Sequence, residues 1–305
     1  MKNSWVGKIA LLVILLSLAG LASAQELEPR AYSPSPAGTS FLVIAFSRAT
    51  GSVTFDPTIP VTNVHGAFNA PLVGIGHTFG LFGRQSLVTA SLPYVYGTIS
   101  GDVGEKSGSI TRSGLADLGM KFSINLHGCP SQTPAEFAAT PHNSFIVAAS
   151  LTVDAPTGQY SSTKLINLGT NRWTFRPEIG FSYPFKKFDF DTYLASSFFT
   201  ENSQYYRGTS TRGEDALNSI QAHASYTFRR ALWLAIDSTW YGGGAVHTNG
   251  GPGTNLQSNS RLGATLSLPL GRHQSAKVSY SSGVTARTGS NFRTLAVAWQ
   301  YVWLH

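Results

Sequence analysis

Apolar side chains alternate with small or polar ones along stretches of ten residues or more in this chain. In residues 173–185, one side of the pattern holds Phe175, Ile179, Phe181, Tyr183 and Phe185, and the other holds Thr174, Arg176, Glu178, Gly180 and Ser182. A period of two residues is the period of a β-strand. Strands of soluble proteins usually have about 5–6 residues, whereas a tilted strand that crosses a membrane needs about 9–11. The length of these stretches therefore favours membrane-crossing strands.

The same alternation predicts twelve strands, near residues 39–49, 64–79, 84–98, 114–127, 144–154, 173–185, 187–199, 215–229, 231–242, 259–270, 274–285 and 292–303. Tight turns follow the even-numbered strands, apart from the longer stretch 128–143, and longer polar loops follow the odd-numbered ones. Outer-membrane barrels have short periplasmic turns and longer extracellular loops. We therefore expect an all-β fold over residues 39–305, a transmembrane antiparallel up-and-down β-barrel of about 12 strands with both ends in the periplasm. A secreted all-β protein is the alternative.

Composition agrees with an exported barrel. Only 12% of the residues are charged, against about 25% in a typical soluble domain, and 31 are glycine. The single cysteine, Cys129, has no disulfide partner within the chain. The formal net charge is +7, but the basic residues are scattered, so we expect no nucleic-acid partner.

Both ends of the chain carry export and assembly features. Lys2 and Lys8, the apolar run 9–16 and the small residues 22–24 form the pattern of a cleaved signal peptide, residues 1–24. We expect residues 25–38 to be a short periplasmic segment and not a plug domain. The last stretch, "RTLAVAWQYVWLH", predicts a closing strand that pairs with the first and turns Trp299, Tyr301 and Trp303 to lipid near the periplasmic interface. Such an aromatic final strand is the kind that the barrel-assembly machinery recognises.

Five pieces of the chain resemble one family of outer-membrane proteins. They are "LEPRAYSPSPAGTSF", "TFGLFGRQSLVTASLPYVYG", "RSGLADLGMKFSINLHG", "APTGQYSSTKLINLGTNRW" and "SNSRLGATLSLPL". The family is the one assigned to the meta-cleavage pathway of phenol degradation, whose members are often called transporters. The resemblance implies an outer-membrane barrel for the uptake of small, often aromatic compounds. It supplies no catalytic or binding residues.

The polar faces of the predicted strands carry charges of both signs. The lumen-lining candidates are Asp117, Lys121, Asp154, Arg176, Glu178, Asp189, Asp191, His223, Arg229, Asp237, Arg261, Lys277 and Arg293. So many charges are tolerable inside a membrane only if they pair or meet water. We expect Asp189 and Asp191 to meet Arg176 on the neighbouring strand. Twelve strands predict a narrow or partly obstructed lumen, and we expect a passive channel whose partners are a small-molecule solute and the lipids and lipopolysaccharide of the outer membrane.

Two alternatives to a channel remain open: an outer-membrane hydrolase that acts on lipids, and a structural or adhesive barrel. The hydrolase would need a Ser–His pair, and His142 and Ser144 have the spacing seen in the outer-membrane phospholipase. They lie on a predicted periplasmic connection, however, where a polar loop is the simpler reading. With the pair on that side of the membrane, we expect no enzyme activity. No histidine pair has the spacing of metal ligands, so we expect no metal or other cofactor.

Overall fold

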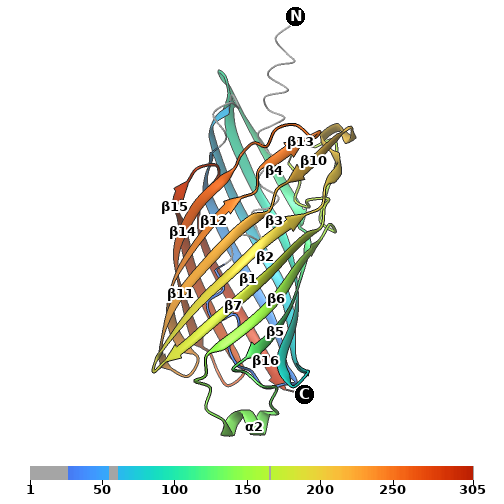
Figure 1. Ribbon diagram of the computed structural model, residues 1–305. Helices are drawn as coiled ribbons and strands as arrows, with labels where there is room; N and C mark the ends of the chain where they lie inside the picture. Colours follow the sequence, from blue (N-terminus) through green and yellow to red (C-terminus); the bar gives the residue numbers. More distant parts are fainter. Residues whose placement is uncertain (1–26, 55–60, 165, 305) are drawn as a thin grey trace, which may run out of the picture.

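Twelve antiparallel strand positions close into a tall barrel (Figure 1), and the computed structural model describes residues 27–54, 61–164 and 166–304 of it. The predicted signal peptide lies outside the described residues. In pairing order the strands are β1 (Thr39–Thr54), β2 (Val61–Leu81), β3 (Arg84–Val103), β4 (Lys106–Leu115) with β5 (Leu118–His127), β6 (Ile146–Ala155), β7 (Thr174–Phe185), β8 (Phe188–Phe199), β11 (Leu217–Arg229), β12 (Leu232–Gly243), β14 (Gln257–Pro269), β15 (Gln274–Ala286) and β16 (Gly289–Leu304).

The last strand closes the barrel on the first. β16 pairs with β1 along its whole length, from Thr39 opposite Leu304 to Thr54 opposite Gly289. β4 and β5 both pair with β3, one above the other, so they share one position in the wall. The predicted barrel of about 12 strands is confirmed.

The alternation places apolar side chains outside and polar ones inside. On β12, Ile236 is 57% exposed while its neighbour Asp237 is fully buried. A soluble sandwich has the opposite arrangement, with its apolar faces packed inward. An apolar outer surface around a polar interior is that of a membrane barrel, which excludes the secreted all-β alternative. No helix among the described residues is long and apolar enough to cross a membrane.

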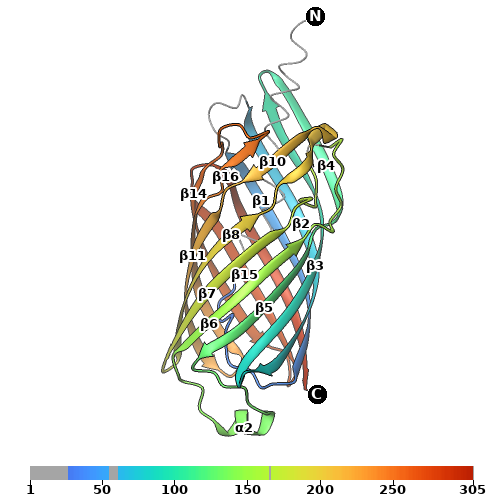
Figure 2. The same cartoon turned by 45° about the vertical axis from the view of Figure 1, so that its right-hand side comes forward.

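The two ends of the barrel differ as expected. Tight turns such as Phe82–Gly83, where both residues have positive φ, lie at the end that carries helix α2 (Pro134–Ala139) and the C-terminus (Figures 1 and 2). A capping box between Thr133 and Glu136 starts α2, which occupies the one long connection at that end.

The opposite, extracellular end carries more structure than the sequence predicted. Residues 101–113, expected as a loop, continue β3 and β4 into a hairpin. The later loops contain β9 (Asn202–Tyr205), the 3₁₀ turn η1 (Tyr206–Gly208), β10 (Ser210–Glu214) and β13 (Val246–Thr248). β9, β10 and β13 form a separate three-stranded sheet.

The aromatic residues of the closing strand stack on its outer face. The rings of Trp299 and Tyr301 lie 6.2 Å apart, and those of Tyr301 and Trp303 lie 5.9 Å apart. Gln300, between them in sequence, lines a cavity inside the barrel.

Trp303→Ala should therefore lower barrel assembly more than Gln300→Ala. Each lost ring pair removes about 0.5–1.5 kcal/mol beyond the loss of buried area, and an interfacial anchor is lost as well. The measurement is the fraction of heat-modifiable, folded protein in outer-membrane preparations. Equal losses for the two variants would contradict the assignment of the faces.

Candidate functional site: the lumen and its N-terminal segment

Residues 27–38, here called the N-terminal segment, run along the inside of the barrel. The backbone N–H of Ala31 donates to the Tyr193 hydroxyl at 3.0 Å, and the N–H of Ser35 donates to the Gln85 side chain at 2.8 Å. Tyr193 and Gln85 are both buried inward-facing strand residues. The segment thus differs from the expected periplasmic extension, because it fills part of the lumen.

Arg30 ties the segment to β8 and β11. Its Nη2 pairs with the Asp189 carboxylate and donates to Thr227 at 2.7 Å, and its Nε donates to Ser225 at 2.8 Å. Its backbone N–H donates to Asp191 at 3.1 Å. One residue of the segment therefore engages both carboxylates that face the lumen on β8.

The expected partner of these carboxylates was Arg176, and that expectation is wrong. β7 and β8 pair antiparallel, with Asp191 opposite Ser182 and Asp189 opposite Pro184. Arg176 lies six residues before Ser182 on β7, farther from the β7–β8 turn, so the register keeps it away from both carboxylates. Charge balance near the turn comes instead from Arg30, which lies far away in sequence.

Tyr32 is the second anchor of the segment. Its hydroxyl donates to Glu178 at 2.6 Å and lies 2.9 Å from the Ser150 hydroxyl. Its ring meets the edge of Tyr193 at a centroid distance of 5.3 Å. The inward-facing Gly180 makes room for this ring, since a Cβ there would lie 2.2 Å from it.

Gly180→Ala should push Tyr32 and the N-terminal segment away from the wall and raise the ion conductance. The added methyl group would clash with the Tyr32 ring, which is held by its hydroxyl hydrogen bonds and by Tyr193, so the ring cannot move aside without losing these contacts. Gly213→Ala is the matched control, since a Cβ at Gly213 meets nothing within 4 Å. Single-channel recordings of both variants test this, and a Gly180→Ala conductance equal to the control would contradict it.

Several other inward charges of β5 to β14 have local partners. Lys121 lies 3.0 Å from Glu28 of the segment and 3.7 Å from Glu178. His223 Nδ1 lies 2.7 Å from Asp237 Oδ1, and Thr265 donates to the same carboxylate at 2.8 Å. Arg261 donates to Ser281 at 2.8 Å. Most of this half of the lumen is filled by side chains, as a narrow barrel requires.

The remaining candidates occupy four different places. Asp154 is on the inner face of β6, and Lys277 on β15 has its ammonium 5.7 Å from the centre of the inward Trp233 ring. Arg229 is exposed at the turn that ends β11. The expected lumen position of Arg293 is wrong. Arg293 is exposed on the outer face of β16, where every second residue, including Leu295 and Val297, points to lipid and away from the lumen.

The other half of the wall is uncharged. The inward positions of β16, β1, β2 and β3 carry no ionisable side chain within the described residues. Their larger apolar members are Phe41, Val43, Val53, Val64, Phe68, Leu72, Leu87, Val95, Ile99, Phe292 and Val302, and the uncharged polar residues Gln85 and Gln300 face inward at the periplasmic end. The lumen therefore has a charged half, to which the N-terminal segment is tied, and an uncharged half, here called the apolar wall.

A cavity of about 260 Å³ separates the segment from the periplasmic end of the apolar wall. Residues 30–35 line one side, and Phe41, Leu87 and Val302 lie on the other. An engineered apolar cavity of about 150 Å³ can hold benzene. The space beside the segment is thus large enough for a monoaromatic compound.

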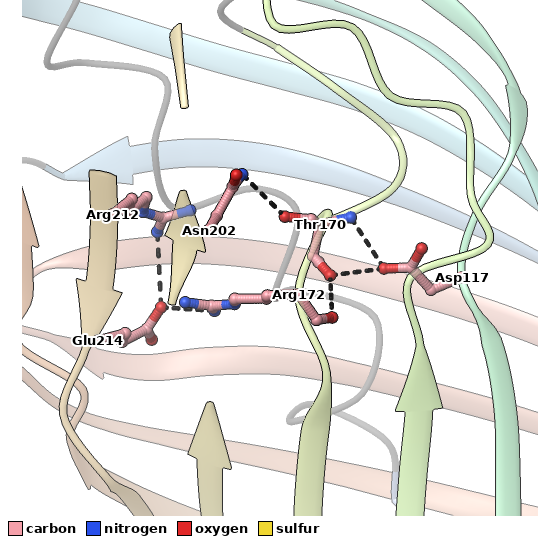
Figure 3. Close-up of polar contacts among 6 residues, drawn as sticks. All are labelled: Asp117, Thr170, Arg172, Asn202, Arg212 and Glu214. Atoms are coloured by element: carbon pink, nitrogen blue, oxygen red, sulfur yellow. Dashed lines mark hydrogen bonds and ion pairs between the residues drawn. The ribbon is translucent and has the colours of Figure 1, made fainter. Parts of the chain in front are cut away.

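The extracellular mouth is tied together by buried polar contacts (Figure 3). Asp117 accepts from the backbone N–H groups of Gly158 and Thr170, both at 2.8 Å. Glu214 pairs with Arg172 at 2.7 Å and with Arg212 at 3.5 Å. Burial and the neighbouring Arg172 lower the pKa of Arg212 to about 10, so it stays charged at neutral pH. Asp117 thus holds a loop rather than facing open lumen.

His142 and Ser144 are exposed in the connection that contains α2. The His142 ring stacks on Phe137 at 3.8 Å and its Nε2 lies 2.9 Å from the Phe137 carbonyl. The histidine is thus engaged with the helix. Among the described residues no group of three His, Cys, Asp or Glu side chains could hold a metal ion.

Fold and lumen together define an outer-membrane β-barrel of twelve strands. The chain belongs to the family described as "Putative MetA-pathway of phenol degradation", which matches residues 52–301. The family expected from the sequence is thereby confirmed. No curated protein matches the chain in sequence.

Solved structures share the fold at low sequence identity. An outer-membrane channel from Pseudomonas putida F1 is 17% identical with a TM-score of 0.76, covering 91% of this chain and 100% of that one. The transport unit of the autotransporter AIDA-I from Escherichia coli is 11% identical with a TM-score of 0.56, covering 97% of each chain.

Proposed function

We propose that this barrel is a passive channel for small, uncharged or weakly polar compounds, aromatic ones among them. The observation that carries the proposal is the two-sided lumen. Its apolar wall has no ionisable group among the described inward positions, whereas the opposite half is charged and held by the N-terminal segment. A path for ions or sugars would need polar groups around its circumference. An uncharged wall suits a solute with little charge.

Two similarities support the same solute class. The family description refers to phenol degradation, and the similar Pseudomonas putida barrel is a channel. The cavity beside the segment has a mixed lining in which Gln85, Asn125 and Gln300 lie near Phe41 and Val302. That mixture suits an aromatic ring with one polar substituent.

The hydrolase alternative has less support. It requires a histidine that activates a nucleophile, and His142 is engaged with Phe137 in the α2 connection. We therefore propose a channel without enzyme activity. A structural or adhesive barrel would leave solute uptake the same in cells with and without the protein.

Lipopolysaccharide is the proposed lipid partner at the outer face. Arg48 and Arg293 are exposed there and are diagonal neighbours, since Arg48 pairs with Leu295 and Thr50 with Arg293. At about 3.3 Å per residue and a tilt of about 40°, Arg48 stands about 23 Å above the periplasmic end of β1, near the top of the apolar band. Guanidinium groups at that height would meet headgroup phosphates. We also propose that the signal peptide is cleaved and that the barrel-assembly machinery recognises the aromatic final strand.

The test compares cells with and without the protein for the uptake of N-phenyl-1-naphthylamine, an uncharged aromatic dye that fluoresces once it passes the outer leaflet. We expect faster uptake with the protein, and an unchanged rate would refute the channel.

The lumen charges are proposed to set the ion selectivity of the residual ionic path. Asp189→Asn combined with Asp191→Asn leaves Arg30 without its carboxylates. The reversal potential in a salt gradient should then move toward anion selectivity. Phe190→Leu, on the outer face between the two, is the matched control. A reversal potential equal to that of the control would contradict this role.

A further inference from the structure

The loop between β6 and β7, described over residues 156–164 and 166–173, places the Ile166 side chain against the far wall. Ile166 is 4% exposed and packs with Val53, Val64, Ile99 and Phe292. These four belong to β1, β2, β3 and β16, the strands of the apolar wall. Ile166 therefore crosses the extracellular mouth and covers the upper end of that wall.

The loop is fixed at its base by polar contacts. Asp117 holds Gly158 and Thr170, and the backbone N–H groups of Leu168 and Gly169 donate to the Gln159 carbonyl at 3.3 and 3.0 Å. These contacts clamp the two arms of the loop to each other and to the rim of the barrel.

The side chain of Ile166, at the tip of the loop, is held by apolar packing and not by polar contacts. The backbone carbonyl of the same residue accepts one hydrogen bond from Arg112 at 3.1 Å. An apolar ligand can replace apolar packing without leaving a buried polar group unsatisfied. An uncharged solute can therefore take the place of the Ile166 side chain without breaking a side-chain hydrogen bond of that residue.

We propose that Ile166 occupies the extracellular binding site for the solute. The site is the apolar pocket formed by Val53, Val64, Ile99 and Phe292, and its ligand is an uncharged aromatic or aliphatic molecule that inserts an apolar group in place of the isoleucine side chain. The solute displaces Ile166, follows the apolar wall downward and leaves through the cavity beside the N-terminal segment. This inference rests on the proposed channel function and adds the binding site and the group that closes it.

A reversible disulfide tests the displacement. Ile166→Cys and Val64→Cys are combined in a Cys129→Ala background, and cells carrying equal amounts of folded barrel are oxidised and then reduced. We expect uptake of N-phenyl-1-naphthylamine to fall on oxidation to the rate of cells without the protein and to return on reduction. Each single-cysteine variant should show the same uptake rate before and after oxidation and reduction, because it can form no disulfide within the chain.

A second variant needs no disulfide. Ile166→Ala empties the pocket and should speed dye uptake, whereas Leu168→Ala, in the same loop but outside the apolar cluster, should not.

A second probe follows the residual ionic path through the lumen. Hydrolysis of nitrocefin by a periplasmic β-lactamase reports the entry of this charged compound, and the disulfide should leave its rate unchanged.

The outcomes separate the two claims. If the unmodified protein speeds dye uptake but the disulfide and Ile166→Ala leave it unchanged, the binding site is refuted and the channel stands. If the disulfide slows nitrocefin hydrolysis and dye uptake equally, the loop covers the mouth for every solute and the apolar binding site is refuted. If the unmodified protein speeds neither probe, the channel function fails and this inference with it.

Discussion

Deletion of residues 27–35 should raise the single-channel conductance several-fold. These residues hold Arg30 and Tyr32 and form one side of the cavity inside the barrel. The deletion leaves Pro36 and Gly38, which join the segment to Thr39 and Thr78 through hydrogen bonds, in place. Without the segment, water can fill the space that it occupied between the charged half and the apolar wall.

The same deletion should destabilise the barrel. Asp189 loses its ion-pair partner Arg30, and Glu178 loses the hydrogen bond from Tyr32 but keeps Lys121 at 3.7 Å. Breaking a fully buried ion pair costs about 3–5 kcal/mol, and the loss here is smaller because the Asp189 side chain is 32% exposed. Water that enters the opened lumen offsets part of this cost. The measurements are conductance in planar bilayers and the temperature at which heat modifiability is lost.

A full-length variant controls for the deletion. Arg30→Ala combined with Tyr32→Ala keeps the chain length but removes both anchors, and it should give an intermediate conductance. An unchanged conductance in the deletion variant would show that the segment does not constrict the path.

Glu214→Gln should loosen the extracellular mouth. Glu214 is the shared carboxylate of two buried guanidinium groups, at 2.7 Å from Arg172 and 3.5 Å from Arg212. Its neutralisation leaves two like charges buried side by side, and the loss of one partner from a buried pair costs about 3–5 kcal/mol. We expect the loops of residues 156–173 and 200–216 to become sensitive to protease added to whole cells.

Glu201→Gln provides the comparison, because Glu201 is exposed in the same loop region and an exposed charge contributes little. A double variant, Glu214→Gln with Arg212→Met, should recover part of the protection, since one of the two unpaired charges is gone. Equal protease sensitivity of Glu214→Gln and Glu201→Gln would show that the arginine cluster does not hold the loops.

The strand pattern was readable because alternation is a local property. Each strand position faces either lipid or lumen, so burial of one residue determines that of its neighbours. The same rule already excludes Arg293 from the lumen, since it shares the parity of Leu295 and Val297. Arg229 follows the inward parity of β11 but lies at its turn, where parity no longer implies burial.

The lumen site with its N-terminal segment was harder to predict from the sequence. Gly180 was assigned to the polar face, but a glycine there does not reveal which side chain uses the space. The segment that supplies Tyr32 has no alternation, and its one arginine and one tyrosine are common residues. An inward glycine beside a carboxylate, as at Gly180 and Glu178, was the only local hint of an inserted ring.

The sequence by itself determined the class of fold, the number of strands, the apolar outer surface and the polar character of the inward faces, because these follow from residue type at a period of two. Only the tertiary structure decided which charges meet. The register of β7 and β8 separates Arg176 from Asp189 and Asp191, and Arg30 reaches them across more than 150 residues of sequence. It also decided that the N-terminal segment lies inside and that Ile166 covers the apolar wall. Such contacts depend on chain closure and on shapes from distant strands, and no local pattern encodes them.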